Sequence, residues 1–335
     1  MQPFRLLLLP PEVTRNVVDE TDMASLLRVR KTCRALHDHA ASILTSDRCR
    51  ILRNYVDDPN LLCEHLTEHR AVVGGLAATK FILRDHTMPS PTLDIYVSNT
   101  NYDVLECRLE EDLDLRMVAV ATKADGNDDD FFEDHVIRVA TFATPTRTRV
   151  IKVHTAEGPS ALQPIAGAWT SALINWFSPE GFACGYPSLT LRRMAVSPRL
   201  DILDDRLYEL FDHLCEQLGF EIARHATYLP RYAHHQTPDI TPMRYACLSD
   251  IFLCHCQGRF FGDYGSLLTV YNLLNTNHDE LRRRQLPPYG IGAAWRLWTT
   301  PYRCENACDY NDLILPDDLR VLLAVFIGVE FLLRG

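Results

Sequence analysis

Two short motifs in the first third of the sequence restrict the fold more than any other feature. Val72-Val73-Gly74-Gly75 is an apolar run that ends in a glycine pair, and a helix is predicted over residues 76–84. A second apolar run, Leu93 to Val97, carries the carboxylate of Asp94. Glycine adopts left-handed backbone easily, so the pair predicts a tight turn. The order strand, turn, helix, strand predicts an α/β unit.

The spacing within the second strand determines which side chains share a face. Alternate strand residues point to the same side, so Asp94 lies between Thr92 and Tyr96 on one face. The unit resembles the opening of polymerase-β-type nucleotidyltransferases, in which the glycine turn holds nucleotide phosphates and two acids, two residues apart, bind divalent metal. This resemblance implies a nucleotide site at Gly74, Gly75 and Asp94, with Mg²⁺ and a nucleoside triphosphate as ligands.

The sequence departs from that pattern at the metal-binding positions. Thr92 stands where the first acid is expected. The third strand, predicted over 149–154, has no acid and contains Lys152, which would repel a cation. Two-metal chemistry needs at least two converging carboxylates. We therefore expect an inactive nucleotidyltransferase-like scaffold with no catalytic residue and no bound metal. A nucleotidyltransferase with an atypical metal site and a nucleotide-binding sensor remain as alternatives.

The N-terminal 45 residues are predicted to form three short helices. Pro11 suits a first helical position, and Thr21 or Asp22 can cap the second helix. The segment resembles an F-box, the helical trio that binds the adaptor protein of cullin-RING ubiquitin ligases. Asp19-Glu20 replaces a hydrophobic position of that motif. The resemblance implies an adaptor face, or a small core beneath it, made of Leu9, Pro10, Val13, Leu26, Leu27, Val29 and Cys33.

Further landmarks extend the resemblance across more than half of the chain. They resemble a family of mushroom-type (basidiomycete) fungal proteins that join an F-box to a degenerate nucleotidyltransferase-like domain. In that family the segment that corresponds to Trp169–Phe177 is a helix. The segments that carry the resemblance, besides the two motifs above, are Phe81 to Arg84, Trp169 to Phe177 and Tyr186 to Thr190.

Composition excludes several classes of function. The formal charge of −10 argues against general nucleic-acid binding, which needs basic surface. Eleven irregularly spaced cysteines do not form a disulfide framework. The apolar runs near both ends are too short for a signal peptide or a membrane span. We expect a cytoplasmic or nuclear protein with reduced thiols and no membrane contact.

The pattern along the chain predicts a mixed α+β fold in three parts. Residues 1–50 form the F-box-like module, 60–200 a nucleotidyltransferase-like mixed sheet flanked by helices, and 201–335 an α+β extension that packs on it. We expect helices over 61–70, 160–169, 204–218 and from about 317, and strands over 114–121, 136–142 and 149–154. The predicted function is substrate recognition, with the cullin-RING adaptor and an unknown protein target as partners.

The sequence contains two groups of potential metal ligands. His65-x-x-Glu68-His69 matches an inverted zinc-protease pattern, but we interpret it as part of a solvated helix face. A cysteine group is interpreted as buried free thiols, because its spacing does not match a zinc knuckle. That group contains Cys247, Cys254, Cys256, Cys304 and Cys308.

Overall fold

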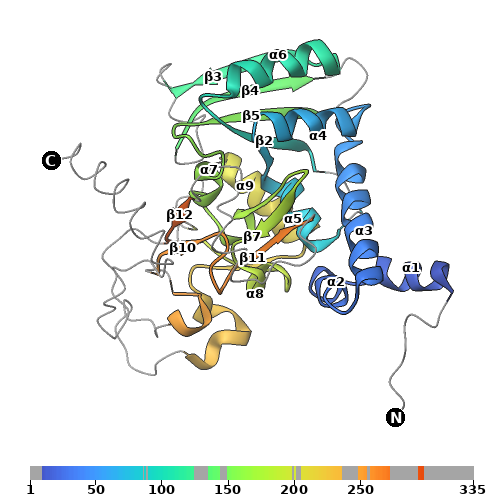
Figure 1. Cartoon of the computed structure of the whole chain (residues 1–335). Helices are drawn as coiled ribbons and strands as arrows, with labels where there is room; N and C mark the ends of the chain where they lie inside the picture. Colours follow the sequence, from blue (N-terminus) through green and yellow to red (C-terminus); the bar gives the residue numbers. More distant parts are fainter. Residues whose placement is uncertain are drawn as a thin grey trace.

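The computed structural model is a mixed α+β protein built around one large sheet (Figure 1). It describes residues 10–85, 87, 90–123, 135–143, 149–197, 200, 205–235, 248–254, 257–271 and 293–297. The helix predicted from about residue 317 therefore lies outside the described residues. Within the described part of the chain, no helix is long and apolar enough to cross a membrane.

The central sheet has eight strands in the order β11-β7-β6-β1-β2-β5-β4-β3. Neighbouring strands run antiparallel except β2 and β5, which are parallel. The strands are β1 (Val72–Val73), β2 (Thr92–Ser98), β3 (Arg116–Thr122), β4 (Val136–Ala143), β5 (Val150–Ala156), β6 (Asn175–Phe177), β7 (Gly181–Cys184) and β11 (Leu267–Val270).

The predicted strand–turn–helix–strand unit is present as β1, α5 (Gly75–Leu83) and β2. Leu93, Ile95 and Val97 on one face of β2 are fully buried in the main hydrophobic core. Helices α4 (Pro59–Glu68) and α6 (Tyr102–Leu113) pack against each other and contribute to the same core. The opposite face of β2 carries Asp94 toward the glycine turn.

The N-terminal helices are α1 (Pro11–Asp19), α2 (Met23–Arg30) and α3 (Arg34–Leu52). Asp22 caps α2 by accepting a hydrogen bond from the backbone N–H of Ser25 at 2.8 Å. Helix α3 runs to Leu52, across the boundary predicted at residue 50. Buried apolar residues of all three helices belong to the core that also holds β2 and α5. The trio and the sheet therefore share one hydrophobic core.

Three buried or half-buried arginines tie the trio to the sheet. Arg84, at the end of α5, pairs with Asp47 of α3 at 2.9 Å and also donates to the backbone carbonyls of Val18 and Thr21. Arg48 donates to the carbonyl of Pro179 at 2.7 Å, in the turn between β6 and β7. Arg30 donates to the carbonyl of Tyr271 at 3.0 Å, just after β11. These bonds join the helices to three separate segments.

Two predicted helices differ from the structure. The segment 160–169 is helical only at α7 (Gln163–Ala166). The helix implied over 169–177 is a 3-10 turn (Ser171–Leu173) followed by β6. β6 is buried on both faces, and such strands are continuous apolar runs that lack a diagnostic period.

The C-terminal described segments are short. The helix predicted over 204–218 is α9 (Asp205–Asp212) followed by a π-helical turn (His213–Gln217). Beyond α9, residues of β11 add a strand to the central sheet. The remaining elements are α8 (Pro187–Thr190), β8 (Met194–Val196), β9 (Glu221–Ala223), β10 (Arg259–Phe260), β12 (Ala294–Trp295) and 3-10 turns at Ala226–Tyr228, Pro230–His235 and Ser249–Ile251.

Replacing Arg84 tests whether the trio depends on its link to α5. The carboxylate of Asp47 is 2% exposed, so Arg84→Met leaves a buried charge without its main partner. We expect a loss of about 3–5 kcal/mol in the free energy of unfolding, measured by urea denaturation. Arg50→Met is the control, because Arg50 lies 3.5 Å from the same carboxylate but is exposed. It should cost less than about 1 kcal/mol. Equal small losses would contradict the prediction.

Candidate functional site

The glycine turn is closed by the strand that follows it. The backbone N–H of Gly74 donates to the carbonyl of Asp94 at 2.9 Å, and Gly74 is the N-cap of α5. Gly75 has a φ of +59°, and a Cβ on it would lie 2.5 Å from Oδ2 of Asp94. A Cβ on Gly74 would lie 2.5 Å from the ring of Tyr96. Both glycines are needed because side chains of β2 press against the turn.

Asp94 is held by side chains of its own chain. Oγ1 of Thr92 lies 3.2 Å from Oδ2 of Asp94, and Nε2 of His154 lies 3.2 Å from Oδ1. The ring of His154 stacks on Tyr96 with centroids 4.7 Å apart. The carboxylate is 16% exposed. Thr92 and His154 thus occupy both oxygens of the carboxylate.

Parallel pairing of β2 and β5 explains this arrangement. The register places Lys152 opposite Asp94 and His154 opposite Tyr96. Because alternate residues share a face, the described strands β2, β5 and β4 offer one carboxylate here, that of Asp94. No local sequence pattern predicts the contact between His154 and Asp94. His154 lies two residues after Lys152 and so shares its face of β5, but its closeness to Asp94 follows only from the register between β2 and β5.

A buried polar group supports the helix behind the turn. Thr79 of α5 donates to the carbonyl of Ala172 at 2.7 Å, and the amide of Asn175 donates to the same carbonyl at 2.6 Å. Lys80 is buried beside them on α5, and burial lowers the pKa of its ammonium group. The landmark segment Trp169 to Phe177 therefore holds the turn-bearing helix in place.

The residues predicted for the adaptor face divide into four groups. Pro10 and Val13 are exposed, and Val13 is followed one turn later by the exposed Val17. Leu26 is fully buried in the core. Leu9 lies outside the described residues. The remaining predicted residues are partly buried and pack against the core: Leu27, Val29 and Cys33.

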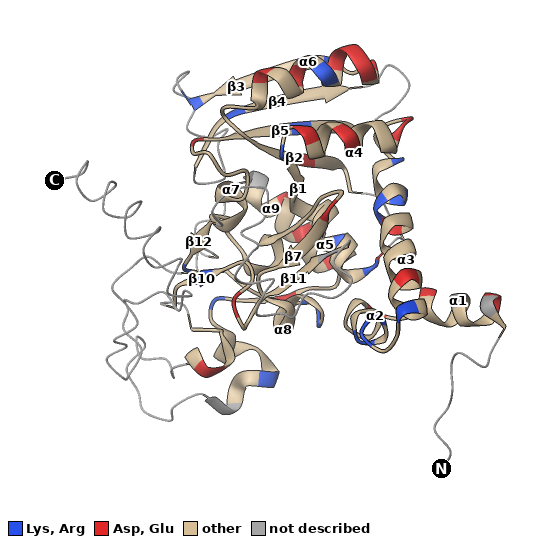
Figure 2. Cartoon of the chain, in the orientation of Figure 1, with Lys and Arg blue, Asp and Glu red and all other residues tan. Residues whose placement is uncertain are grey.

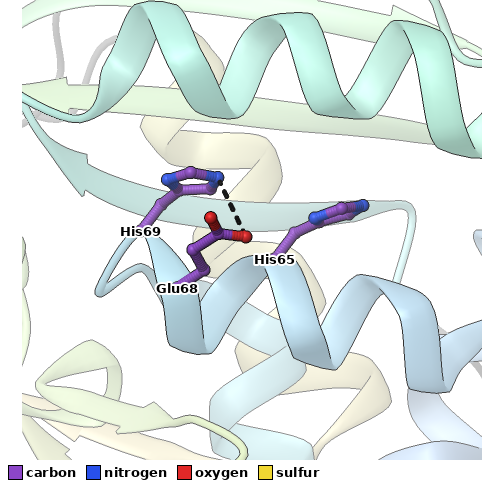
Figure 3. A group of neighbouring side chains, drawn as sticks. All are labelled: His65, Glu68 and His69. Atoms are coloured by element: carbon purple, nitrogen blue, oxygen red, sulfur yellow. Dashed lines mark ion pairs between the residues drawn. The ribbon is translucent and has the colours of Figure 1, made fainter.

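The prediction that His65 and His69 lie on a solvated helix face is wrong. His65 and His69 are each only 6% exposed, because α6 packs against this side of α4. Glu68 between them is exposed, and its Oε2 lies 3.9 Å from Nε2 of His69 (Figure 3). Burial lowers the pKa of His69, which favours its neutral form. Of the predicted cysteine group, Cys254 is buried and forms no disulfide, and Cys247, Cys256, Cys304 and Cys308 lie outside the described residues.

Comparison with known proteins assigns the helical trio. Residues 6–44 match the family model of the F-box domain. The N-terminus is an F-box. The match covers α1, α2 and the first part of α3, and it carries no information about the sheet. Searches of curated proteins and of solved structures found no match.

A pair of glycine substitutions tests the closure of the turn. Gly75→Ala should destabilise the protein by about 2 kcal/mol or more, from left-handed backbone strain plus the contact with Asp94. Gly219→Ala is the matched control, because its φ is +66° but the nearest atom to its Cβ would be 3.8 Å away. It should cost about 1 kcal/mol. Urea denaturation measures both.

A double variant separates strain from contact. Gly75→Ala should lower the free energy of unfolding by more than Gly219→Ala does. Adding Asp94→Ala to Gly75→Ala should recover that excess. Equal losses for the two glycine variants would show that Asp94 moves aside freely.

Proposed function

We propose that this protein is a non-catalytic substrate-recognition subunit of a cullin-RING ubiquitin ligase. In this proposal the F-box binds the adaptor protein and the sheet domain binds a protein target. One observation carries it: the helix α1 of the matched F-box presents an apolar row to solvent, while α2 and α3 bury apolar residues in the core shared with the sheet.

The apolar row has the form of a helix-docking surface. Val13 and Val17 are 42% and 44% exposed and lie one helical turn apart, with the exposed Pro10 preceding them. Apolar residues at this spacing are the anchors by which one helix binds a groove or another helix. The acidic pair Asp19-Glu20 is exposed at the other end of α1. We therefore assign adaptor contact to the Pro10, Val13 and Val17 side.

The arrangement around Asp94 favours a scaffold over an enzyme. The carboxylate of Asp94 is held by Thr92 and His154 and faces Lys152 across the strand pair. Within the described strands β2, β4 and β5, no second acid converges on it as a two-metal site requires. This supports the resemblance to a degenerate nucleotidyltransferase-like domain of the fungal F-box type. It favours neither a metal-dependent nucleotidyltransferase nor a nucleotide sensor. We further propose that the protein works in the cytoplasm or nucleus and does not bind nucleic acid generally.

Adaptor binding is tested on the full chain with a charged α1. Val13→Asp/Val17→Asp places two carboxylates in the proposed interface and should weaken binding to purified adaptor by at least about 100-fold, since each buried valine contributes about 1.5 kcal/mol or more. Isothermal titration calorimetry measures the change.

Val104→Asp is the control for this test. Val104 is 52% exposed on α6, far along the sequence from the F-box, and its replacement should leave adaptor affinity unchanged. No binding by the unmodified chain, or equal binding by the α1 variant, would overturn the proposed function.

Nucleotide binding gives a second, separate test. Adding Mg²⁺ with each of the four nucleoside triphosphates should leave the melting temperature unchanged, because a ligand stabilises only a state that binds it. No labelled nucleotide should be transferred to acceptor. Saturable stabilisation that disappears in Asp94→Asn would instead support the sensor, and transfer would support the enzyme.

A further inference from the structure

Three potential metal ligands gather on the last turns of α4. His65 and His69 lie one helical turn apart and Glu68 lies between them (Figure 3). One ligand atom from each residue can be chosen so that all three lie within 4.8 Å of one another. Among the described residues, no other group of three or more histidine, cysteine, aspartate or glutamate side chains meets this condition. The sequence motif His-x-x-Glu-His thus corresponds to a real cluster in space.

Three ring nitrogens of the two buried imidazoles make no hydrogen bond, although carboxylates of Asp112 and Glu68 lie near them. No hydrogen bond is made by Nδ1 or Nε2 of His65 or by Nε2 of His69. Asp112 of α6 places Oδ2 3.1 Å from Nε2 of His65, outside hydrogen-bonding geometry. Buried polar atoms are nearly always satisfied, so three such nitrogens in one cluster need an explanation. A bound cation would supply it, because neutral imidazole nitrogens are metal ligands.

We propose that His65, Glu68 and His69 bind one divalent transition-metal ion, with Zn²⁺ as the best match. Two imidazole nitrogens and one carboxylate oxygen are a ligand set that zinc accepts, with a fourth position left for water. Ligand atoms around tetrahedral zinc are about 3.4 Å apart, given bonds of about 2.1 Å. Metal binding would therefore draw together ligand atoms that now lie within 4.8 Å of one another. This inference does not rest on the proposed ubiquitin-ligase function.

The surroundings of the cluster favour a cation. Acidic residues are frequent on α6, the helix that packs against α4 (Figure 2). Asp112 can orient His65 by accepting from one ring nitrogen while the other binds the ion, the usual carboxylate–histidine–metal arrangement. Arg108 lies 3.7 Å from Asp112 and is the cation that faces the site from α6.

The ion would join elements that the sheet depends on. It would link two consecutive turns of α4 and, through Asp112, connect α4 to α6. α4 leads directly into β1 and the glycine turn. We assign the ion a structural role, because the described residues near it include no group arranged for catalysis. Its presence should therefore raise stability.

The test uses the full chain, stripped with a chelator and titrated with Zn²⁺ and Co²⁺. We expect one ion per chain at this site and a higher melting temperature with Zn²⁺. The chain has eleven cysteines that could also bind metal. The Co²⁺ spectrum separates the two cases, since thiolate ligands give an intense charge-transfer band that nitrogen and oxygen ligands do not. The expected spectrum lacks that band.

Matched variants locate the site. His65→Gln/His69→Gln should abolish binding, and Glu68→Gln should weaken it at least about tenfold. Glu68 is exposed, so its variant keeps the fold even where the double histidine variant does not. His37→Gln is the control: His37 has an unsatisfied nitrogen and lies 3.3 Å from Asp38, but belongs to no three-ligand cluster. No metal uptake, a thiolate band alone, or unchanged affinity in Glu68→Gln would overturn the proposal.

Discussion

The buried ion pair between Arg84 and Asp47 is the contact on which the docking of the N-terminal helices onto the sheet domain depends. A trio of short helices of about 40 residues has too little core to be stable alone. Here the guanidinium of Arg84 neutralises a carboxylate of α3 and also satisfies carbonyls at the end of α1. A buried charge that lost this partner would be costly, so the pair specifies one docking geometry for the F-box.

The residues of the glycine turn and Asp94 are explained by how they pack on one another. Gly75 adopts positive φ and leaves space that the carboxylate of Asp94 fills. The carboxylate is in turn held by Thr92 and His154. Glycine is needed at position 75 for two reasons, its positive φ and the closeness of Asp94. Without the aspartate, only the backbone conformation would require glycine there.

The sequence predicted local features well and long-range ones poorly. The turn at Gly74, the cap at Asp22 and the strands of the β4–β5 hairpin follow from neighbouring residues, and the structure has them. β6 was missed because a strand buried on both faces has no alternation to detect. The contact of His154 with Asp94 and the burial of His65 depend on register and helix packing. Such contacts join residues far apart in sequence, which no local pattern encodes.

Tyr271 has a consequence for the order of folding during synthesis. Its carbonyl accepts from Arg30, its ring lies 5.5 Å from the guanidinium of Arg48, and β11 just before it completes the sheet. The F-box leaves the ribosome more than two hundred residues before this partner exists. Contacts of such long sequence separation form late and slowly. Docking of the F-box on the sheet therefore ends in two stages: the core shared with α5 and β2 can form early, and the contacts of Arg30 and Arg48 with Tyr271 are added last.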